Sequence, residues 1–165
     1  MLEGADLLVD WGVKPVRHEK NLRCLAKIKE LARYYQPEVI VLEDHVARDS
    51  RRHARIHKLI GSTVRLASQS GIRVRRFSRS NLRLAFRCDG AQTKHEIAVA
   101  VCKHFTELEP RLPRRRLPWM SEDYRMQMFD AVALALASFR LTGNSRSLGV
   151  HGLAPEKVGC RSSDR

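Results

Sequence analysis

Hydrophobic runs long enough to cross a membrane are missing from this sequence. The longest apolar run, Ala131–Phe139, contains a serine and is well short of the roughly 20 residues that a spanning helix needs. The first residues, Met1–Asp6, carry no basic segment and no long apolar segment, which excludes a secretory signal. The sequence therefore predicts a cytoplasmic protein that has no membrane partner.

Closely spaced cysteines are missing as well. The four cysteines, Cys24, Cys88, Cys102 and Cys160, form no Cys-x-x-Cys pair. Such scattered residues indicate reduced thiols in a cytosolic protein rather than a disulfide framework. A zinc site built from Cys88, His95, Cys102 and His104 is the weaker alternative, because these residues lack the paired spacing of zinc ligands.

Acidic residues are nearly absent from residues 48–87. This segment contains eleven arginines and one lysine but a single acid, Asp49, so its net charge is +11 against +13 for the whole chain. Such an imbalance predicts a polyanionic partner, and nucleic acid is preferred over an anionic membrane surface, with a solvated helix surface as the alternative. Few aromatic residues lie among these cations, so base stacking along a single strand is not indicated.

Arginine suits phosphate because its planar guanidinium donates two hydrogen bonds at once. Helical spacing places several cations of the segment on one face, and the loop Arg111–Arg116 would extend that surface. The residues predicted to contact phosphates are Arg51, Arg52, Arg55, Lys58, Arg73, Arg75, Arg76 and Arg79.

The order of the predicted elements indicates an α/β fold, and 165 residues suffice for one sizeable core. Strands are predicted at Asp6–Val13, Glu38–Leu42 and Ile72–Phe77, the second of them apolar enough for burial on both faces. Helices are predicted at Glu19–Tyr35, Arg48–Ser70, Ser78–Phe86, Ile97–Phe105 (after a capping box at Thr93) and Ser121–Phe139. Sites in such folds form at the carboxyl ends of the strands.

Two carboxylates stand out against the basic background. Glu43 ends the most apolar strand, and Asp130 lies inside the most apolar helix. A lone buried carboxylate usually pairs with a cation, and oxygen ligands of this kind hold Mg²⁺ or Mn²⁺. The structural alternatives are an exposed strand end for Glu43 and an arginine ion pair for Asp130. Asp123, two helical turns before Asp130, or the adjacent Glu122 would add a ligand, although acids also cap helices.

The segments EVIVLED, GIRVRRFSRSNLRLAF, TKHEIAVAV and WMSEDYRMQMFDAVALAL resemble, in this order, the RuvC-like branch of the ribonuclease H superfamily. The resemblance covers about residues 6–139. It implies a ribonuclease H-like mixed sheet flanked by helices over residues 1–139. Glycine, serine and basic residues without periodicity predict a disordered basic tail over residues 140–165. It also implies metal-binding and catalytic roles for Glu43 and Asp130, with Asp123 as the third acid, and a place for Lys94 near substrate phosphates.

The sequence departs from the family pattern at two points. The first-strand Asp of the family has no match, since Asp6–Val13 resembles the third strand of the family sheet, and the first two strands are therefore expected to be absent. Asp10 is the alternative first-strand acid. Gln127 stands where the family tends to carry an acid or histidine three residues before Asp130.

The resemblance implies a structure-specific DNA endonuclease that cleaves crossover junctions by phosphodiester hydrolysis with Mg²⁺, or Mn²⁺ in its place. The alternative is a non-catalytic nucleic-acid-binding protein or an inactive fragment of such a nuclease. RNA remains open as a substrate, because contacts to a 2′-hydroxyl cannot be read from composition. A homodimer would suit a symmetric junction.

Overall fold

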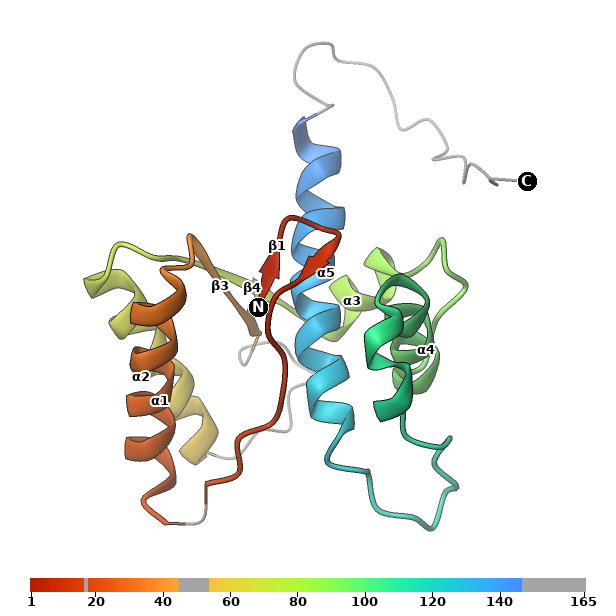
Figure 1. The fold of residues 1–165 in the computed structure, drawn as a ribbon, viewed down its shortest axis with the longest axis horizontal. Coiled ribbons are helices and arrows are strands. Elements are labelled where there is room, and N and C mark those ends of the chain that lie inside the picture. Colours follow the sequence, from red (N-terminus) through yellow and green to blue (C-terminus); the bar gives the residue numbers. More distant parts are fainter. Residues whose placement is uncertain (17, 45–53, 147–165) are drawn as a thin grey trace.

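The computed structural model describes residues 1–16, 18–44 and 54–146. Helices and short strands alternate along the chain, as predicted for an α/β protein (Figure 1). The elements are β1 (Leu2–Glu3), β2 (Leu7–Leu8), α1 (Lys20–Tyr35), β3 (Val39–Glu43), α2 (Ala54–Gln69), β4 (Arg73–Phe77), α3 (Arg79–Ala85), α4 (Lys94–His104), the 3₁₀ helix η1 (Thr106–Arg111) and α5 (Met126–Arg146).

Strands β3 and β4 pair in parallel, with Val39 opposite Arg73 and Glu43 opposite Phe77. Parallel strands need a long crossover, and helix α2 makes the described part of it. The two strand predictions are confirmed to within one residue at each end. All of β3 is only half-buried, against the prediction of burial on both faces, because within the described residues it has a strand neighbour on one edge only.

Helices cover the β3–β4 pair on both faces (Figure 1). Helices α1 and α2 pack together on one face, and α5 contacts both strands on the other. Helices α3 and α4 lie beyond α5, so α5 is covered from two directions. No helix of the described ranges is both long enough and apolar enough to cross a bilayer.

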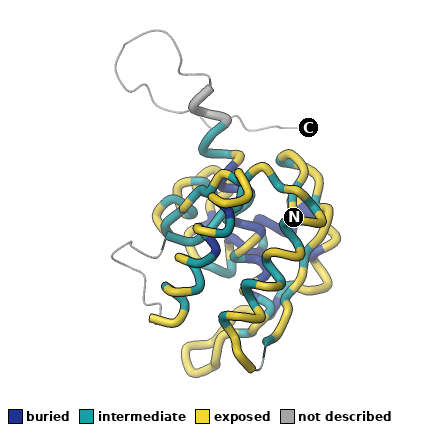
Figure 2. Tube along the Cα trace, turned by 90° about the vertical axis from the view of Figure 1, so that its left-hand side faces the viewer, coloured by how far each residue is buried: buried dark blue, intermediate teal, exposed yellow. Residues whose placement is uncertain are grey.

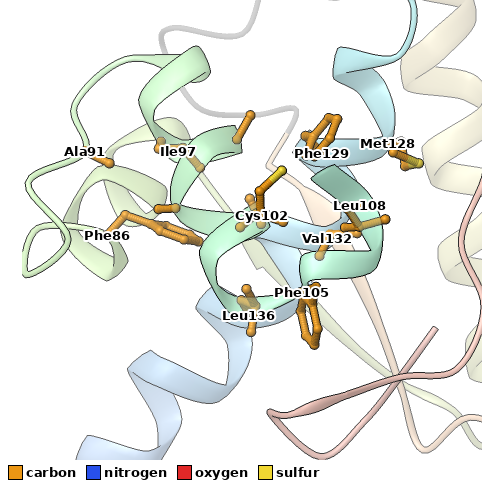
Figure 3. Packing of buried hydrophobic residues seen from close by; sticks show 14 of the residues in the cluster. Phe86, Ala91, Ile97, Cys102, Phe105, Leu108, Met128, Phe129, Val132 and Leu136 are labelled. Atoms are coloured by element: carbon orange, nitrogen blue, oxygen red, sulfur yellow. The ribbon is translucent and has the colours of Figure 1, made fainter. Parts of the chain in front are cut away.

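The hydrophobic core lies where α4 and α5 meet, not around the strands (Figure 3). Its largest fully buried side chains are Phe86, Phe105, Phe129, Leu108, Leu136 and Val101. Buried segments gather in the interior, while the outer helices and loops are exposed (Figure 2). The side chain of Cys102 is buried in this core, and that burial raises the pKa of its thiol, as expected for an inert reduced cysteine.

The amino-terminal strand is shorter than predicted. Of Asp6–Val13 only Leu7–Leu8 is a strand, and it pairs antiparallel with Leu2–Glu3. The backbone N–H groups of Val9 and Asp10 both donate to the carbonyl of Met1, so the regular ladder ends after Leu8. The result is a small hairpin whose turn uses Gly4 at positive φ.

Helix α5 begins and ends later than predicted. It starts at Met126 rather than Ser121, because Asp123 first forms a tight turn whose carboxylate accepts the Arg125 backbone N–H. Glu122 and Asp123 therefore precede helix α5 instead of forming its first turn. The predicted end at Phe139 is also wrong, since α5 continues to Arg146. Of the predicted basic tail, residues 147–165 lie outside the described residues.

Side chains beyond Phe139 bind neighbouring elements, which explains why α5 continues. Arg140 donates to the carbonyl of Ala85 at 3.2 Å, pairs with Asp89, and lies over the Phe86 ring at 4.5 Å. The sequence around these residues is polar and lacks a clear apolar period. The helix is therefore held there by tertiary contacts, which local sequence patterns do not reveal.

Candidate functional site

Glu43 lies at the carboxyl end of β3, as predicted. Its side chain is 19% exposed, and its Oε1 atom lies 3.8 Å from Nε of Arg79. The strand register explains this pair, because Glu43 is opposite Phe77 and the chain turns through Ser78 directly into α3. The capping box between Ser78 and Asn81 starts α3 there, which brings Arg79 to the strand end.

Three elements meet around the ammonium group of Lys94. Its Nζ atom lies 2.8 Å from Oδ2 of Asp130 on α5 and 2.5 Å from Oε1 of Glu122 in the preceding loop. Lys94 is the first residue of α4, whose start is held by the capping box of Thr93 and Glu96. Asp130, a predicted metal ligand, therefore lies beside Lys94, the residue that was predicted to lie near substrate phosphates.

The acids of this group hold Lys94 in its charged form. Burial by itself lowers the pKa of Lys94, but the hydrogen bonds to Asp130 and Glu122 outweigh it, so the pKa is raised above its ordinary value. At neutral pH one cation therefore lies between two carboxylate side chains. The arrangement is half-exposed, since the side chains of Lys94 and Asp130 are 38% and 37% exposed.

Asp123, the predicted third acid, is used elsewhere. Both of its carboxylate oxygens accept hydrogen bonds from the Arg125 guanidinium, and one also accepts the Arg125 backbone N–H. Glu122, its neighbour, is the acid that reaches Lys94. The sequence singled out both acids but could not choose between them, because the choice depends on a turn that is set only when the loop packs.

The Asp123–Arg125 pair predicts a specific pH dependence of stability. Side-chain and backbone hydrogen bonds from Arg125 lower the pKa of Asp123, so its stabilising contribution is present above the ordinary carboxyl pKa and is lost as the pH falls through the lowered value. We expect Asp123→Asn to lower the thermal midpoint at about pH 6 and to have a smaller effect at about pH 2. Thermal unfolding followed by circular dichroism tests this, and an equal decrease at both pH values would contradict it.

The described residues that were predicted to bind phosphate have different surroundings. Arg51 and Arg52 lie outside the described residues. Arg75 is used inside the fold, because its guanidinium donates to Oγ of Ser138 at 3.2 Å and to Oγ1 of Thr142 at 2.9 Å on α5. Side chains alternate along a strand, so the exposed Arg76 points to the opposite face of β4 from Arg75.

Most of the other residues predicted to bind phosphate contact different partners. Arg55 donates to Oδ1 of Asn21 at 3.3 Å, and Arg73 pairs with Glu38 at 3.0 Å, both in exposed positions. Lys58 is exposed on α2. Arg79 pairs with Glu43, and Lys94 pairs with Asp130 and Glu122, so each of these two cations contacts a candidate acid.

The weaker zinc alternative is not favoured. Nε2 of His95 lies 3.1 Å from the carbonyl of Pro113, and Nε2 of His104 lies 2.9 Å from the carbonyl of Ala5. Cys88 is exposed, whereas Cys102 is buried. Within the parts of the chain that the structure describes, no group of three or more His, Cys, Asp or Glu side chains is placed to hold a metal ion.

A hard divalent cation nonetheless fits the donor chemistry at Lys94. Asp130 and Glu122 already direct carboxylate oxygens at one positive charge. Mg²⁺ commonly binds through only one or two carboxylates and completes its shell with water and substrate phosphate. Glu43 lies on β3, which α5 contacts, and its own side chain pairs with Arg79.

Comparison with solved structures identifies the fold. A structure of Thermus thermophilus RuvC matches with a TM-score of 0.57 and 20% identity over 80% of this chain and 76% of that chain. Thermus thermophilus RuvC in complex with a Holliday junction substrate matches with a TM-score of 0.54 and 18% identity over 81% and 78%. No protein-family model and no curated protein sequence matches the chain. The chain therefore has a RuvC-like fold, which confirms the predicted ribonuclease H-like class.

Proposed function

We propose that this chain is a divalent-metal-dependent endonuclease that cleaves branched DNA of the Holliday junction type. The observation that carries the proposal is the convergence of Asp130 and Glu122 on one cation within a RuvC-like fold. One of the structural neighbours is bound to a Holliday junction, which supports branched DNA as the substrate. The net charge of +13 supports a polyanionic partner in general.

The proposed ligands are Asp130, Glu122 and Glu43, and Mg²⁺ or Mn²⁺ is the proposed ion. When bound, such an ion polarises phosphoryl oxygens and lowers the pKa of its water. The chain's own residues then have separate tasks. The three acids would hold the ion, and Arg79 beside Glu43 would offset part of the acidic charge. In the free protein Lys94 pairs with Asp130 and Glu122 and offsets one of their two negative charges, and its ammonium group can donate to a phosphate oxygen of a bound strand.

Exposed cations on α2 would hold the substrate by its backbone. Arg55, Lys58 and Arg65 are exposed on this helix, and contacts of this type position DNA without reading its sequence. Recognition would then depend on the shape of the branch. We also propose that the active form is a homodimer, because a junction of two-fold symmetry presents two equivalent scissile positions.

A non-catalytic nucleic-acid-binding protein is the second candidate function. It is favoured by the absence, within the described ranges, of a cluster of three metal-binding side chains. It is also favoured by Lys94, whose ammonium group already pairs with two of the proposed ligands. Both candidates share the basic surface, so binding alone does not separate them.

Cleavage of a labelled four-way junction separates the two candidates. We expect the full chain to nick or resolve the junction with Mg²⁺ or Mn²⁺, and to lose that activity when EDTA removes the metal. A linear duplex of the same sequence should be cut much more slowly, and a matched RNA junction shows whether the sugar matters. Metal-independent binding without any cleavage would contradict the nuclease and support the binding protein.

A further inference from the structure

The loop between η1 and α5 exposes an unusual concentration of large apolar side chains. Within eight residues Trp119 is 79% exposed, Tyr124 66%, Met120 49% and Leu117 47%. Single exposed apolar residues are ordinary on a protein surface, but a group of four with two aromatic rings indicates an interaction site. The loop runs along one end of the molecule, from η1 to the first residues of α5 (Figure 1).

The backbone of this loop is ordered by its own hydrogen bonds. The N–H of Met120 donates to the carbonyl of Leu117 at 3.0 Å, which closes a four-residue turn with Pro118 at the position that favours proline. Nε of Arg116 donates to the carbonyl of Met120 at 2.5 Å and holds the turn from outside. Trp119 is therefore displayed at the tip of a constrained turn.

Tyr124 is held in a second turn, at the start of α5. The Gln127 N–H donates to the carbonyl of Tyr124 at 3.2 Å, and the neighbouring Asp123 and Arg125 side chains bind each other across it. Two aromatic rings are thus presented by backbone whose ordering cost is already met in the free protein. Such pre-organisation favours binding of flat ligands.

The charged side chains next to Trp119 and Tyr124 in the chain indicate which class of ligand would bind. Arg114, Arg115 and Arg116 are exposed directly before the turn. The acids of the loop, Glu122 and Asp123, are paired with Lys94 and Arg125. A partner that offers flat apolar faces and negative charge together is a nucleic-acid strand with its bases out of the duplex stack.

The loop also contacts the candidate site. Glu122 binds Lys94, and Lys94 binds Asp130. We propose that Trp119 and Tyr124 form a stacking site for unpaired bases at a branch point, beside the acidic group. This inference rests on the proposed function, and it deepens that function by naming what the protein recognises in a branched substrate. The sequence did not indicate base stacking. The proposed stacking site differs from that expectation because the exposure of Trp119 and Tyr124 is a property of the folded chain.

The test compares bulged and fully paired DNA. Fluorescence anisotropy, without divalent metal, gives the affinity of the full chain for a duplex with a three-base bulge containing 2-aminopurine and for the same duplex without the bulge. We expect Trp119→Ala and Tyr124→Ala each to weaken binding of bulged DNA by roughly five- to 100-fold and to remove the 2-aminopurine quenching. Paired duplex should bind as before. Trp119→Phe should retain most of the affinity, and Tyr34→Ala, equally exposed on α1, should change nothing.

The outcomes separate this inference from the proposed function. If the parent binds both DNAs and Trp119→Ala binds each with the same affinity as the parent, the stacking site is wrong, while the proposed binding of nucleic acid is retained. If both DNAs lose affinity equally in a variant that melts like the parent, the loop contributes to general binding, which also overturns stacking. If the parent binds neither DNA, the proposed function fails together with this inference. A fourth outcome would also overturn the stacking site. If sedimentation without DNA gives a lower mass for Trp119→Ala than for the parent, the loop is a contact between copies of the chain.

Discussion

Asp130→Asn and Glu43→Gln should each reduce metal-dependent junction cleavage by roughly 100-fold or more, because each removes a negative charge from the proposed ion site while keeping the side-chain shape. DNA binding should stay within about threefold of the parent, because the variants keep the exposed cations of α2 and remove only a carboxylate, which makes no favourable contact with phosphate. Gel-based cleavage with Mg²⁺ and with Mn²⁺, beside anisotropy of the uncut junction, measures both quantities.

Matched variants make this expectation specific. Glu107→Gln removes the same charge from the exposed surface of η1 and should leave the cleavage rate unchanged. Glu122→Gln and Asp123→Asn decide which loop acid is a ligand. Contacts with Lys94 predict a large loss for Glu122→Gln, and the pairing with Arg125 predicts a small loss for Asp123→Asn. Cleavage at the parent rate by Asp130→Asn would refute the proposed site.

Replacing the exposed cations of α2 should flatten the salt dependence of DNA binding. On duplex DNA, log affinity falls by roughly 0.9 log units per log unit of salt for each phosphate that is neutralised. A variant with Arg55→Gln, Lys58→Gln and Arg65→Gln should therefore lose up to about 2.7 from this slope if all three contact phosphate. Anisotropy titrations between about 50 and 300 mM salt measure the slope directly.

The control for this experiment removes the same total charge from other elements. Lys20→Gln, Lys29→Gln and Lys103→Gln together replace exposed lysines on α1 and α4. This variant should keep the parent slope, although it weakens long-range attraction slightly. Equal flattening in both variants would mean that net charge alone controls binding. An unchanged slope in the α2 variant would mean that these side chains only solvate the surface.

Elements whose signals are local were predictable from the sequence. The β-branched run before Glu43 predicted β3, and the capping box of Thr93 and Glu96 predicted the start of α4. Because a strand end and a helix cap are set by neighbouring residues, these signals were sufficient to place Glu43 and Lys94 on their elements. The ordered similarity to RuvC-like proteins added the fold class, which the structural comparison confirms.

Which side chains meet depends on how the folded segments pack against one another. Glu122 and Asp123 are adjacent and chemically alike, yet packing of the loop directs Glu122 to Lys94 and leaves Asp123 with Arg125. Arg75 and Arg76 are likewise neighbours, but the alternation of β4 sends Arg75 to α5, so the basic segment is divided between two faces. The exposure of Trp119 follows from the same cause. A side chain is buried or displayed according to contacts between segments far apart in the chain, and local composition does not contain those contacts.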